Sequence, residues 1–565
     1  MFSHFQERET LKNLKARHSL SIALVLSVLC LSALLAPASL AGKLSDKGSR
    51  PAPAIRITPP APVFDDAARL SELAQRRARV AERIGPKGML VLFSTEPRVY
   101  ANDVFYQYRQ ENNLYYLTDL KQQGATLVLM PGSAGPKEIL FLPRRNPGAE
   151  TWTGHMYSPE EARALSGITE IWEAREFAPF MQGMRARQLY RPKAEAILLG
   201  NAPPEGTPES SPSPAPGITP PRSSSDPLFG AMERGEADLY LLIPRESESA
   251  EYRQEQSFAA SWAKSATGFN VHTAWPIFNE MRQRKSAMEL QLMQHAIDIS
   301  IEAHERAQAV AAEAQHEYEV DAEIAYTFKR RNADNWGYPD IVGCGPNATT
   351  LHYIESQGRV GANQLLLIDA GAEFDHYSAD VTRTFPVSGK FTPEQAAVYQ
   401  IVYDAQEAGA RSIKPGVSTM SDVHDAATGV IKDGLLRLGL ITDRESKWQY
   451  RVWFMHGTSH WLGMNVHDVG VRDAKLAPGM VFTNEPGIYI REDALDNLPK
   501  TPEMQKFIAA VRPAFEKYKG IGVRIEDDML VTETGARWMT ETLPRSIKEI
   551  EAFMARARQE LRQPR

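Results

Sequence analysis

Cysteine is almost absent from this sequence, which holds only Cys30 and Cys344 among 565 residues. A framework of disulfide bonds is therefore excluded as the basis of the fold. Long basic stretches are also absent, and the formal net charge is only -6, which argues against a surface that binds nucleic acid. With 43% apolar and 24% charged residues, the chain is typical of globular proteins, and its length favours two domains.

An apolar run long enough to cross a membrane is missing as well. The run at 22–35 is shorter than the roughly 20 residues that a spanning helix needs. The residues before this run are basic: Arg8, Lys12, Lys15 and Arg17. Small residues follow and end at Ala41, so the pattern predicts a signal peptide over 1–41, with an uncleaved membrane anchor as the alternative.

Cleavage after Ala41 would remove Cys30 and leave one cysteine in the mature chain. An exported protein without an internal disulfide fits the bacterial periplasm. We therefore expect export to the periplasm and no stable membrane insertion after cleavage.

Two low-complexity segments divide the remaining chain. Residues 42–63 are rich in Pro, Ala, Lys and Ser, which predicts a disordered tether. Residues 200–227 are rich in Pro and Ser, and we interpret them as an insertion within the first domain.

The segments on either side of the insertion predict an α/β domain over 64–274. An amphipathic helix begins near Asp65 and ends before Gly85. Short apolar runs bounded by Gly and Pro then predict buried strands at 89–94, 125–131 and 138–143. A second domain, 275–555, begins near Trp275 with a connecting loop and a long amphipathic helix.

One segment of the second domain, 364–387, combines an apolar strand, a polar turn and a second strand. With the turn centred between Phe374 and Asp375, Asp369 and Asp380 face each other directly across the hairpin. Like charges destabilise a sheet at such positions, so a cation is expected between them. If the register slips by one residue, one of the two acids points to solvent instead.

Two further acids interrupt apolar strands: Glu485 in GMVFTNEPGIYI and Glu526 in GIGVRIEDDMLVT. A charged side chain in an apolar strand is rarely buried without a partner, which favours a metal-ligand role for both. The alternative for each is a surface position on an edge strand.

Histidines gather in the stretch 453–470, which contains His456, His460 and His467. The spacing of the first two suits a helical zinc pair, but Gly457 stands where the zinc-protease pattern has glutamate. One histidine nitrogen and four carboxylates form a hard, oxygen-rich site that suits manganese or a similar ion.

The charge of these ligands predicts the number of ions. Four carboxylates carry too much negative charge for one divalent ion, whereas two ions that share bridging carboxylates balance it. Ions roughly 3.5 to 4 Å apart can hold a bridging hydroxide and polarise the carbonyl that it attacks. The predicted ligands are Asp369, Asp380, His460, Glu485 and Glu526.

These residues, in this order, resemble the ligands of the pita-bread metallopeptidases, and among these the aminopeptidase P family. The strings that carry the resemblance are DAGAEFDHYSADVTRTF, HGTSHWLG, NEPGIY and GVRIEDD. YRQENNLYYLTDL and ATLVLMPG are similar to the N-terminal domain of the same family. The resemblance spans about 65–555 and implies an α/β N-terminal domain plus an α+β pita-bread catalytic domain.

The resemblance further implies removal of the N-terminal residue from peptides with proline in second position. Two metals, commonly manganese, would be bound by the five ligands, with Asp380 and Glu526 bridging. Glu485 would act as the general base and then help the proline nitrogen leave.

Four other residues receive roles from the resemblance alone. His352 and His467 would contact the substrate and steady the tetrahedral intermediate. His456 would line the proline pocket, and Arg524 would lie behind the ligands. Without the resemblance, the residues around His352 favour a histidine on a surface loop.

Two alternative functions share the fold. A prolidase would use the same metals but require a dipeptide, and Ser459 and Trp461 around His460 resemble aminopeptidase P more closely. A creatinase-like or inactive member would lack the metals, which the presence of all five ligands argues against. As partners we expect peptide substrates and further copies of this chain, in a dimer or tetramer.

One segment is long for this family. Residues 491–522 read largely as an amphipathic helix that ends before Pro513. We expect this segment to narrow the cleft or to build an oligomer contact.

Overall fold

The computed structural model describes residues 53–200, 218–219, 226–244, 252–263 and 268–561. The predicted signal peptide, the first part of the tether and most of the low-complexity insertion lie outside the described residues.

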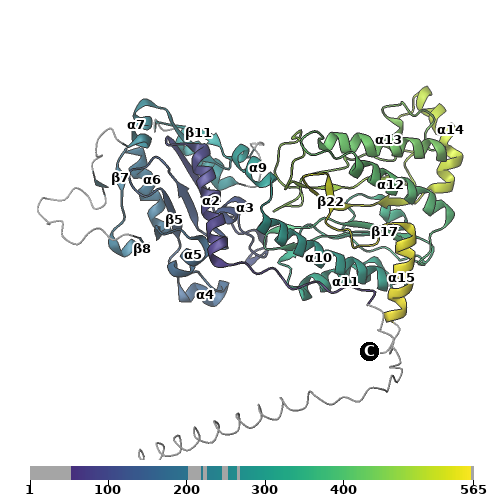
Figure 1. The fold of residues 1–565 in the computed structure, drawn as a ribbon, viewed down its shortest axis with the longest axis horizontal. Helices are drawn as coiled ribbons and strands as arrows, with labels where there is room; N and C mark the ends of the chain where they lie inside the picture. The colour runs from purple at the N-terminus through teal and green to yellow at the C-terminus, as the bar shows by residue number, and fades with distance from the viewer. Residues whose placement is uncertain (1–52, 201–217, 220–225, 245–251, 264–267, 562–565) are drawn as a thin grey trace, which may run out of the picture. The chain divides into compact units, whose positions relative to one another are not determined.

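Seven strands form a mixed sheet in the first half of the described chain, in the order β11-β10-β1-β4-β5-β6-β8 (Figure 1). β1 is parallel to β10 and antiparallel to β4. The bounds are β1 Gly88–Phe93, β4 Thr126–Leu129, β5 Glu138–Leu142, β6 Ile171–Glu173, β8 Ile197–Leu199, β10 Ala237–Leu241 and β11 Phe269–Thr273. The three strands predicted from the apolar runs are confirmed as β1, β4 and β5.

Helices cover both faces of this sheet. They are α2 Asp66–Ile84, α3 Asn112–Thr118, α5 Pro159–Ser166, α6 Phe177–Arg185, α7 Pro227–Arg234 and α8 Arg253–Ala263. Leu90 and Leu92 of β1 pack in a core shared with α2, α3 and α5. Met89, Val91 and Phe93 pack in a second core, shared with α6, α7 and α8. Because both faces are buried, the apolar run of β1 is continuous.

This half also contains several smaller elements. They are β2 Val99–Ala101, β3 Val104–Phe105, α4 Pro147–Thr153, β7 Leu189–Tyr190 and β9 Ile218–Thr219. β2 and β3 pair with each other, and β7 pairs with β9.

The second half is built from short strands in four small sheets, ordered β13-β14-β17, β18-β21-β22, β12-β15-β16 and β19-β20. The bounds are β12 Asn335–Trp336, β13 Ile341–Cys344, β14 Leu365–Asp369, β15 Ala372–Phe374, β16 Tyr377–Ser378, β17 Thr382–Pro386, β18 Val481–Asn484, β19 Gly487–Tyr489, β20 Gly522–Arg524, β21 Asp527–Val531 and β22 Ala536–Trp538.

Long helices enclose these strands. They are α10 Ala287–Val310, α11 Glu317–Arg330, α12 Pro393–Arg411, α13 Met420–Leu438, α14 Pro502–Tyr518 and α15 Ile547–Leu561. Figure 1 shows the strands between α10 and α11 on one side and α12 and α13 on the other. One apolar core runs through these helices and strands. The α+β architecture predicted for this half is therefore confirmed.

The connection between the halves is more helical than predicted. Residues 275–283, predicted as a loop in part, form α9 Trp275–Gln283. Arg282 of α9 donates to Asn113 Oδ1 at 2.8 Å and forms a buried ion pair with Asp468. The described residues from Ala54 onward belong to one compact unit, so the division at Trp275 stays a prediction.

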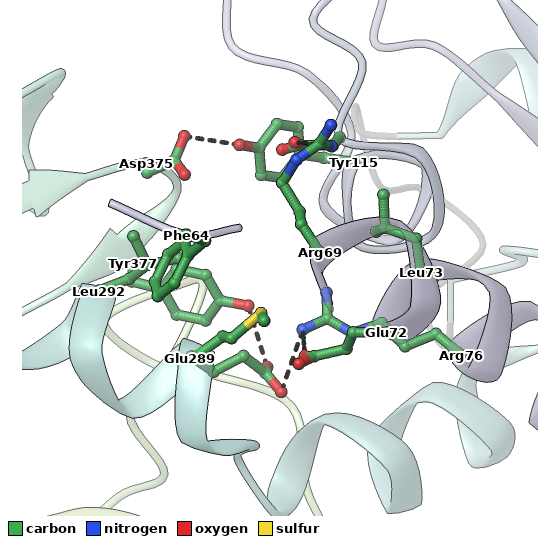
Figure 2. Close-up of a pocket in the computed structure, with 12 residues that line it drawn as sticks. Phe64, Arg69, Glu72, Leu73, Arg76, Tyr115, Glu289, Leu292, Asp375 and Tyr377 are labelled. Carbon is green, nitrogen blue, oxygen red and sulfur yellow. Dashed lines mark hydrogen bonds and ion pairs between the residues drawn. The ribbon is translucent and has the colours of Figure 1, made fainter. Parts of the chain in front are cut away.

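Polar side chains join α2, α3 and α10 to the turn between β15 and β16 (Figure 2). Tyr115 Oη donates to Asp375 Oδ1 at 2.6 Å, and Tyr377 Oη donates to Glu289 Oε1 at 2.9 Å. Arg76 lies 3.4 Å from Glu289 as an ion pair. The charged side chains that line the cavity of about 60 Å³ are already paired, either with one another or, for Asp375, with Lys121, so we interpret the cavity as part of the packing.

The prediction of a disordered tether is wrong for its last part, because residues 54–58 contact the second half of the protein. Ile55 is buried in the core of the second half. The Arg56 side chain pairs with Glu305 at 2.7 Å, and Thr58 N donates to Glu302 Oε2 at 2.7 Å. Composition could not show this docking, because it depends on carboxylates of α10 far along the chain.

The predicted end of the helix before Pro513 is also wrong. α14 continues through Pro513 to Tyr518. The missing proline N–H leaves the carbonyl of Ala509 without its helical donor, but both residues are exposed, so water can replace the bond. Buried Phe507 and Phe515 of α14 pack near Trp448 and Trp453, which outweighs the cost of the proline. The cleft and oligomer roles of this segment stay predictions.

No helix among the described residues combines the length and the apolar character needed to cross a membrane.

The docking of the segment after residue 53 predicts different effects for two neighbouring isoleucines. Ile55→Ala should lower the free energy of unfolding by about 2 kcal/mol, because Ile55 is buried in the core. Ile57→Ala is the matched control: its side chain is 67% exposed, so the change should be under about 0.5 kcal/mol. Denaturant unfolding measures both, and equal effects would contradict the docking.

Candidate metal centre

The hairpin of β14 and β17 places the first two acids. In the antiparallel register, Asp369 lies opposite Thr382 rather than opposite Asp380. Asp380 precedes Thr382 by two residues, and strand side chains alternate, so both acids still occupy one face. The predicted register is therefore wrong, while the predicted proximity of the two carboxylates is not.

The turn itself explains the shift in register. Asp375 and His376 are its two central residues, with φ of 49° and 68°. Left-handed φ at both positions is the geometry of a tight two-residue hairpin turn that normally contains glycine. Tyr115 supports the strained pair from outside, because its hydroxyl bonds Asp375 and its ring stacks on His376 at 3.9 Å. The local sequence could not reveal a contact from 260 residues away.

Glu485 and Glu526 lie at breaks between strands rather than within strands as predicted. Glu485 follows β18, and its backbone N–H donates to Thr458 O at 2.9 Å. Glu526 lies between β20 and β21, and its backbone N–H donates to Thr382 O at 3.1 Å. These breaks leave both side chains free to turn toward the hairpin.

His460 completes the cluster with one ring nitrogen facing inward. Its Nδ1 lies 3.1 Å from the carbonyl oxygen of Trp461, which requires a proton on Nδ1. Nε2 then faces Asp380 Oδ2 at 3.2 Å and Glu485 Oε1 at 3.6 Å. Ligand atoms of Asp380, His460 and Glu526 all lie within 4.8 Å of one another. A carbonyl that fixes the tautomer in this way prepares a histidine for metal binding.

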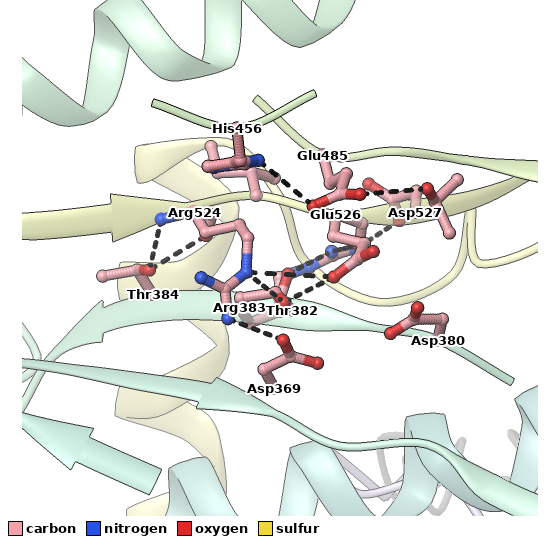
Figure 3. Close-up of polar contacts among 12 residues, drawn as sticks. Asp369, Asp380, Thr382, Arg383, Thr384, His456, Glu485, Arg524, Glu526 and Asp527 are labelled. Atoms are coloured by element: carbon pink, nitrogen blue, oxygen red, sulfur yellow. Dashed lines mark hydrogen bonds and ion pairs between the residues drawn. The ribbon is translucent and has the colours of Figure 1, made fainter. Parts of the chain in front are cut away.

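Asp369 is joined to the cluster through Arg524 (Figure 3). Arg524 Nη2 donates to Asp369 Oδ2 at 2.6 Å, and Arg524 Nε lies 4.0 Å from Glu526 Oε2. Thr382 Oγ1 links the same groups, since it accepts from Arg524 Nε at 3.0 Å and donates to Glu526 Oε2 at 2.7 Å. Ligand atoms of Asp380, His460 and Glu526 therefore lie close together, Glu485 faces His460, and Asp369 contacts Arg524, which also lies beside Glu526. The metal-ligand role of the five residues and the supporting role of Arg524 stay predictions.

The pKa values of the clustered side chains are raised, which shows that negative charge is in excess there. Burial, together with neighbouring carboxylates, raises the pKa of Asp380, raises that of Glu526 strongly and raises that of Glu485 to about 7. Burial lowers the pKa of His460, but Asp380 and Glu485 more than offset this and raise it to about 9. Carboxylates with raised pKa values beside an inward-facing imidazole nitrogen form a donor set that fits divalent cations.

The other three predicted histidines surround the cluster. His467 packs edge-on against His460, with ring centroids 4.4 Å apart. His456 Nδ1 lies 3.6 Å from Glu485 Oε2, and its Nε2 lies 2.9 Å from Tyr489 Oη. His352 is exposed on a loop. Burial lowers the pKa of both His456 and His467, and His352 is close enough to lower both pKa values further by electrostatic repulsion.

Four residues at this site were not predicted from the sequence: Tyr338, which is partly buried, and Thr382, Tyr489 and Asp528, which are buried. Tyr338 Oη donates to Asp369 Oδ1 at 2.5 Å, and Asp528 Oδ2 accepts from the backbone N–H of Asp380 at 3.2 Å. Tyr489 and Thr382 hold Arg524. Thr382 stands two residues after Asp380, so alternation could have placed it on the same face. Tyr338 lies in a loop, where no pattern marks it.

Family comparisons agree with the fold and the cluster. Residues 291–533 match metallopeptidase family M24, and residues 73–190 match the aminopeptidase P N-terminal domain. These two matches define the class as a pita-bread metallopeptidase.

Individual relatives extend over both halves. The Xaa-Pro aminopeptidase of Haemophilus influenzae is 33% identical over 492 residues, which cover 86% of this chain and 97% of that protein. The Xaa-Pro aminopeptidase of Escherichia coli is 32% identical over 500 residues, covering 86% and 98%. The solved structure of Escherichia coli aminopeptidase P with the inhibitor Pro-Leu superposes with a TM-score of 0.69 at 30% identity, covering 87% of this chain and 99% of that one. This chain belongs to the aminopeptidase P family.

The raised pKa values predict that metal binding depends on pH. At neutral pH, protons occupy part of the cluster, and they must leave before the ligands can bind metal. The affinity of the metal-free protein for Mn²⁺ should therefore rise with pH through about 7 and about 9, the pKa values of Glu485 and His460.

Titration calorimetry at pH values on either side of this range, in two buffers of different ionisation enthalpy, measures both the affinity and the protons released. A chelator titrated under the same conditions corrects for the buffer's own affinity for the metal. Binding that releases no protons and does not change with pH would contradict the proton occupancy of the cluster.

Proposed function

We propose that this chain removes the N-terminal residue from peptides whose second residue is proline, using two divalent metal ions held by Asp369, Asp380, His460, Glu485 and Glu526. Membership of the aminopeptidase P family supports the reaction. The single observation that supports the metal centre is the convergence of Asp380, His460 and Glu526 within 4.8 Å. Asp380 and Glu526 are proposed as the bridging ligands, and the oxygen-rich donor set favours manganese.

Divalent ions, when bound, supply Lewis-acid activation of water and of the peptide carbonyl. Glu485 has the position of a general base, because one carboxylate oxygen faces His460 and the other faces His456. In this role Glu485 takes a proton from the attacking water. It then returns the proton to the proline nitrogen as the peptide bond breaks.

His456 suits a proline pocket because both of its nitrogens are already engaged. Burial and the nearby Arg524 lower its pKa to about 3, so the ring stays neutral. Nδ1 lies 2.7 Å from the carbonyl oxygen of Gly457, and Nε2 accepts from Tyr489 Oη. A neutral ring with satisfied nitrogens offers an apolar surface to a pyrrolidine ring. His352 and His467, at the rim of the cluster, are proposed to donate to the oxyanion that develops on the substrate.

The chemistry of the X-Pro bond suits such a site. Proline has no amide N–H, so an enzyme that grips an extended backbone by its hydrogen bonds loses one of them at this bond. A site that holds the peptide by its amino terminus and the scissile carbonyl does not need that N–H. Arg524 and Tyr338 keep both oxygens of Asp369 fixed, so this ligand is oriented before substrate arrives.

Peptide length distinguishes this proposal from a prolidase. Arg-Pro-Pro should be cleaved after arginine, Arg-Ala-Ala should resist as the matched control, and added Mn²⁺ should raise the rate. Asp380→Asn should lower kcat by at least about 100-fold, because a bridging ligand is lost. Chromatography of the products measures each rate. Cleavage confined to the dipeptide Gly-Pro, or full activity of a metal-free protein, would contradict the proposal.

We also propose export to the periplasm and assembly into a dimer or tetramer. The N-terminal pattern of residues 1–41 supports export, with a retained membrane anchor as the alternative. A patch of large exposed apolar side chains on the β2–β3 hairpin supports association between copies: Val99, Tyr100, Val104, Phe105 and Tyr106.

Native mass spectrometry of protein purified from a bacterial periplasm tests both points at once. The subunit mass should correspond to a chain that begins at Gly42, and the complex should contain two or four copies. A full-length subunit would contradict cleavage, and a monomer would contradict assembly.

A further inference from the structure

His352 sits on the long connection between β13 and β14, at 345–364. The connection begins with a short helical turn, Gly345–Thr349, and then passes through His352, whose side chain is exposed. The place of this imidazole relative to the metal ligands is therefore set by the backbone of the connection. What holds that backbone decides where the imidazole lies.

Glu317, the first residue of α11, joins the start of this connection to Gly358, which lies beyond His352. Its carboxylate is completely buried. Oε1 accepts from the backbone N–H of Cys344 at 2.6 Å and from Asn347 Nδ2 at 2.9 Å. Oε2 accepts from the backbone N–H of Gly358 at 2.6 Å. Hydrogen bonds to an ionised carboxylate are among the stronger ones in proteins, so one side chain restrains residues on both sides of His352.

Gly358 gives an independent sign that the connection is fitted around this carboxylate. A Cβ at position 358 would lie 2.7 and 2.8 Å from the two oxygens of Glu317, and 2.3 Å from Asn347 Nδ2. The backbone pairs there as well, since Glu317 N donates to Gly358 O at 3.0 Å. No side chain larger than that of glycine fits without moving the carboxylate or the connection.

We propose that Glu317 is a positioning residue for His352, which it holds at the rim of the metal cluster by fixing the connection on both sides of it. This inference rests on the role of His352 in the proposed function. Both carboxylate oxygens accept hydrogen bonds, so a neutral amide in place of the carboxylate would present an N–H to an N–H on one side. The connection would then be released on that side.

Glu317→Gln tests whether two acceptor oxygens are required at this position, with almost no change in side-chain volume. We expect kcat on Arg-Pro-Pro to fall about tenfold, with metal content unchanged, because His352 is displaced and not removed. His352→Ala alone should lower kcat by about 100-fold, as expected for loss of one oxyanion donor. In the His352→Ala background, Glu317→Gln should change kcat by less than about twofold, because the residue that it positions is gone.

Glu302→Gln is the matched control. Glu302 is a buried glutamate of the neighbouring helix α10 that accepts hydrogen bonds from Thr58 and Arg331. This substitution should lower stability without lowering kcat, in either background. Hydrogen exchange of peptides covering 344–358 should rise in Glu317→Gln and stay unchanged in Glu302→Gln. If Glu317→Gln does not fold, Gly358→Ala displaces the same connection and should show the same dependence on His352.

Two results would overturn the inference, and they are distinguishable. If His352→Ala shows the expected loss but the effects of the two substitutions on kcat multiply fully, Glu317 does not act through His352, while the proposed function stands. If His352→Ala keeps full activity, the role of His352 in the proposed function fails together with this inference.

Discussion

Four carboxyl groups, those of Asp369, Asp380, Glu485 and Glu526, share one mostly buried space with a single histidine. Their mutual repulsion in a poorly hydrated interior is the constraint on which the rest of the site depends. Arg524 offsets part of the charge through a short ion pair with Asp369 and a longer one with Glu526. The remaining charge must be met by protons or by bound cations, and only cations leave the carboxylates free to act at neutral pH. The fold around the cluster can be understood as the means of holding these groups together.

Buried anchors on the surrounding segments do much of this holding. The ion pair between Arg282 and Asp468 fixes the residue next to His467, and both side chains are at most 2% exposed. Glu317 fixes the connection that carries His352. Arg282 lies on α9, at the junction of the two halves, and also donates to Asn113 of α3, so the first half contributes to the site without supplying a ligand. Packing at this junction and geometry at the cluster are therefore coupled.

Much of the site could be predicted from the sequence, because a charged residue in an apolar strand and a cluster of histidines are visible without a structure. The ligands and the α/β and α+β halves followed from such patterns and from the family resemblance. The hairpin register did not, because Tyr115, far away in the chain, supports the left-handed conformation of Asp375 and His376. The docking of Ile55 and the passage of α14 through Pro513 were missed for the same reason: packing against distant segments outweighed local preference. Tyr338 and Glu317 act by tertiary contacts that leave no periodic trace in the sequence.

If the five ligands hold two cations, a crystal structure of the protein loaded with Mn²⁺ should contain both. Anomalous diffraction recorded on both sides of the manganese absorption edge should show two manganese peaks per chain, each within reach of Asp380 and Glu526. A single peak, or none, at a cluster whose side chains keep the arrangement described above would mean that these residues do not form a two-metal site.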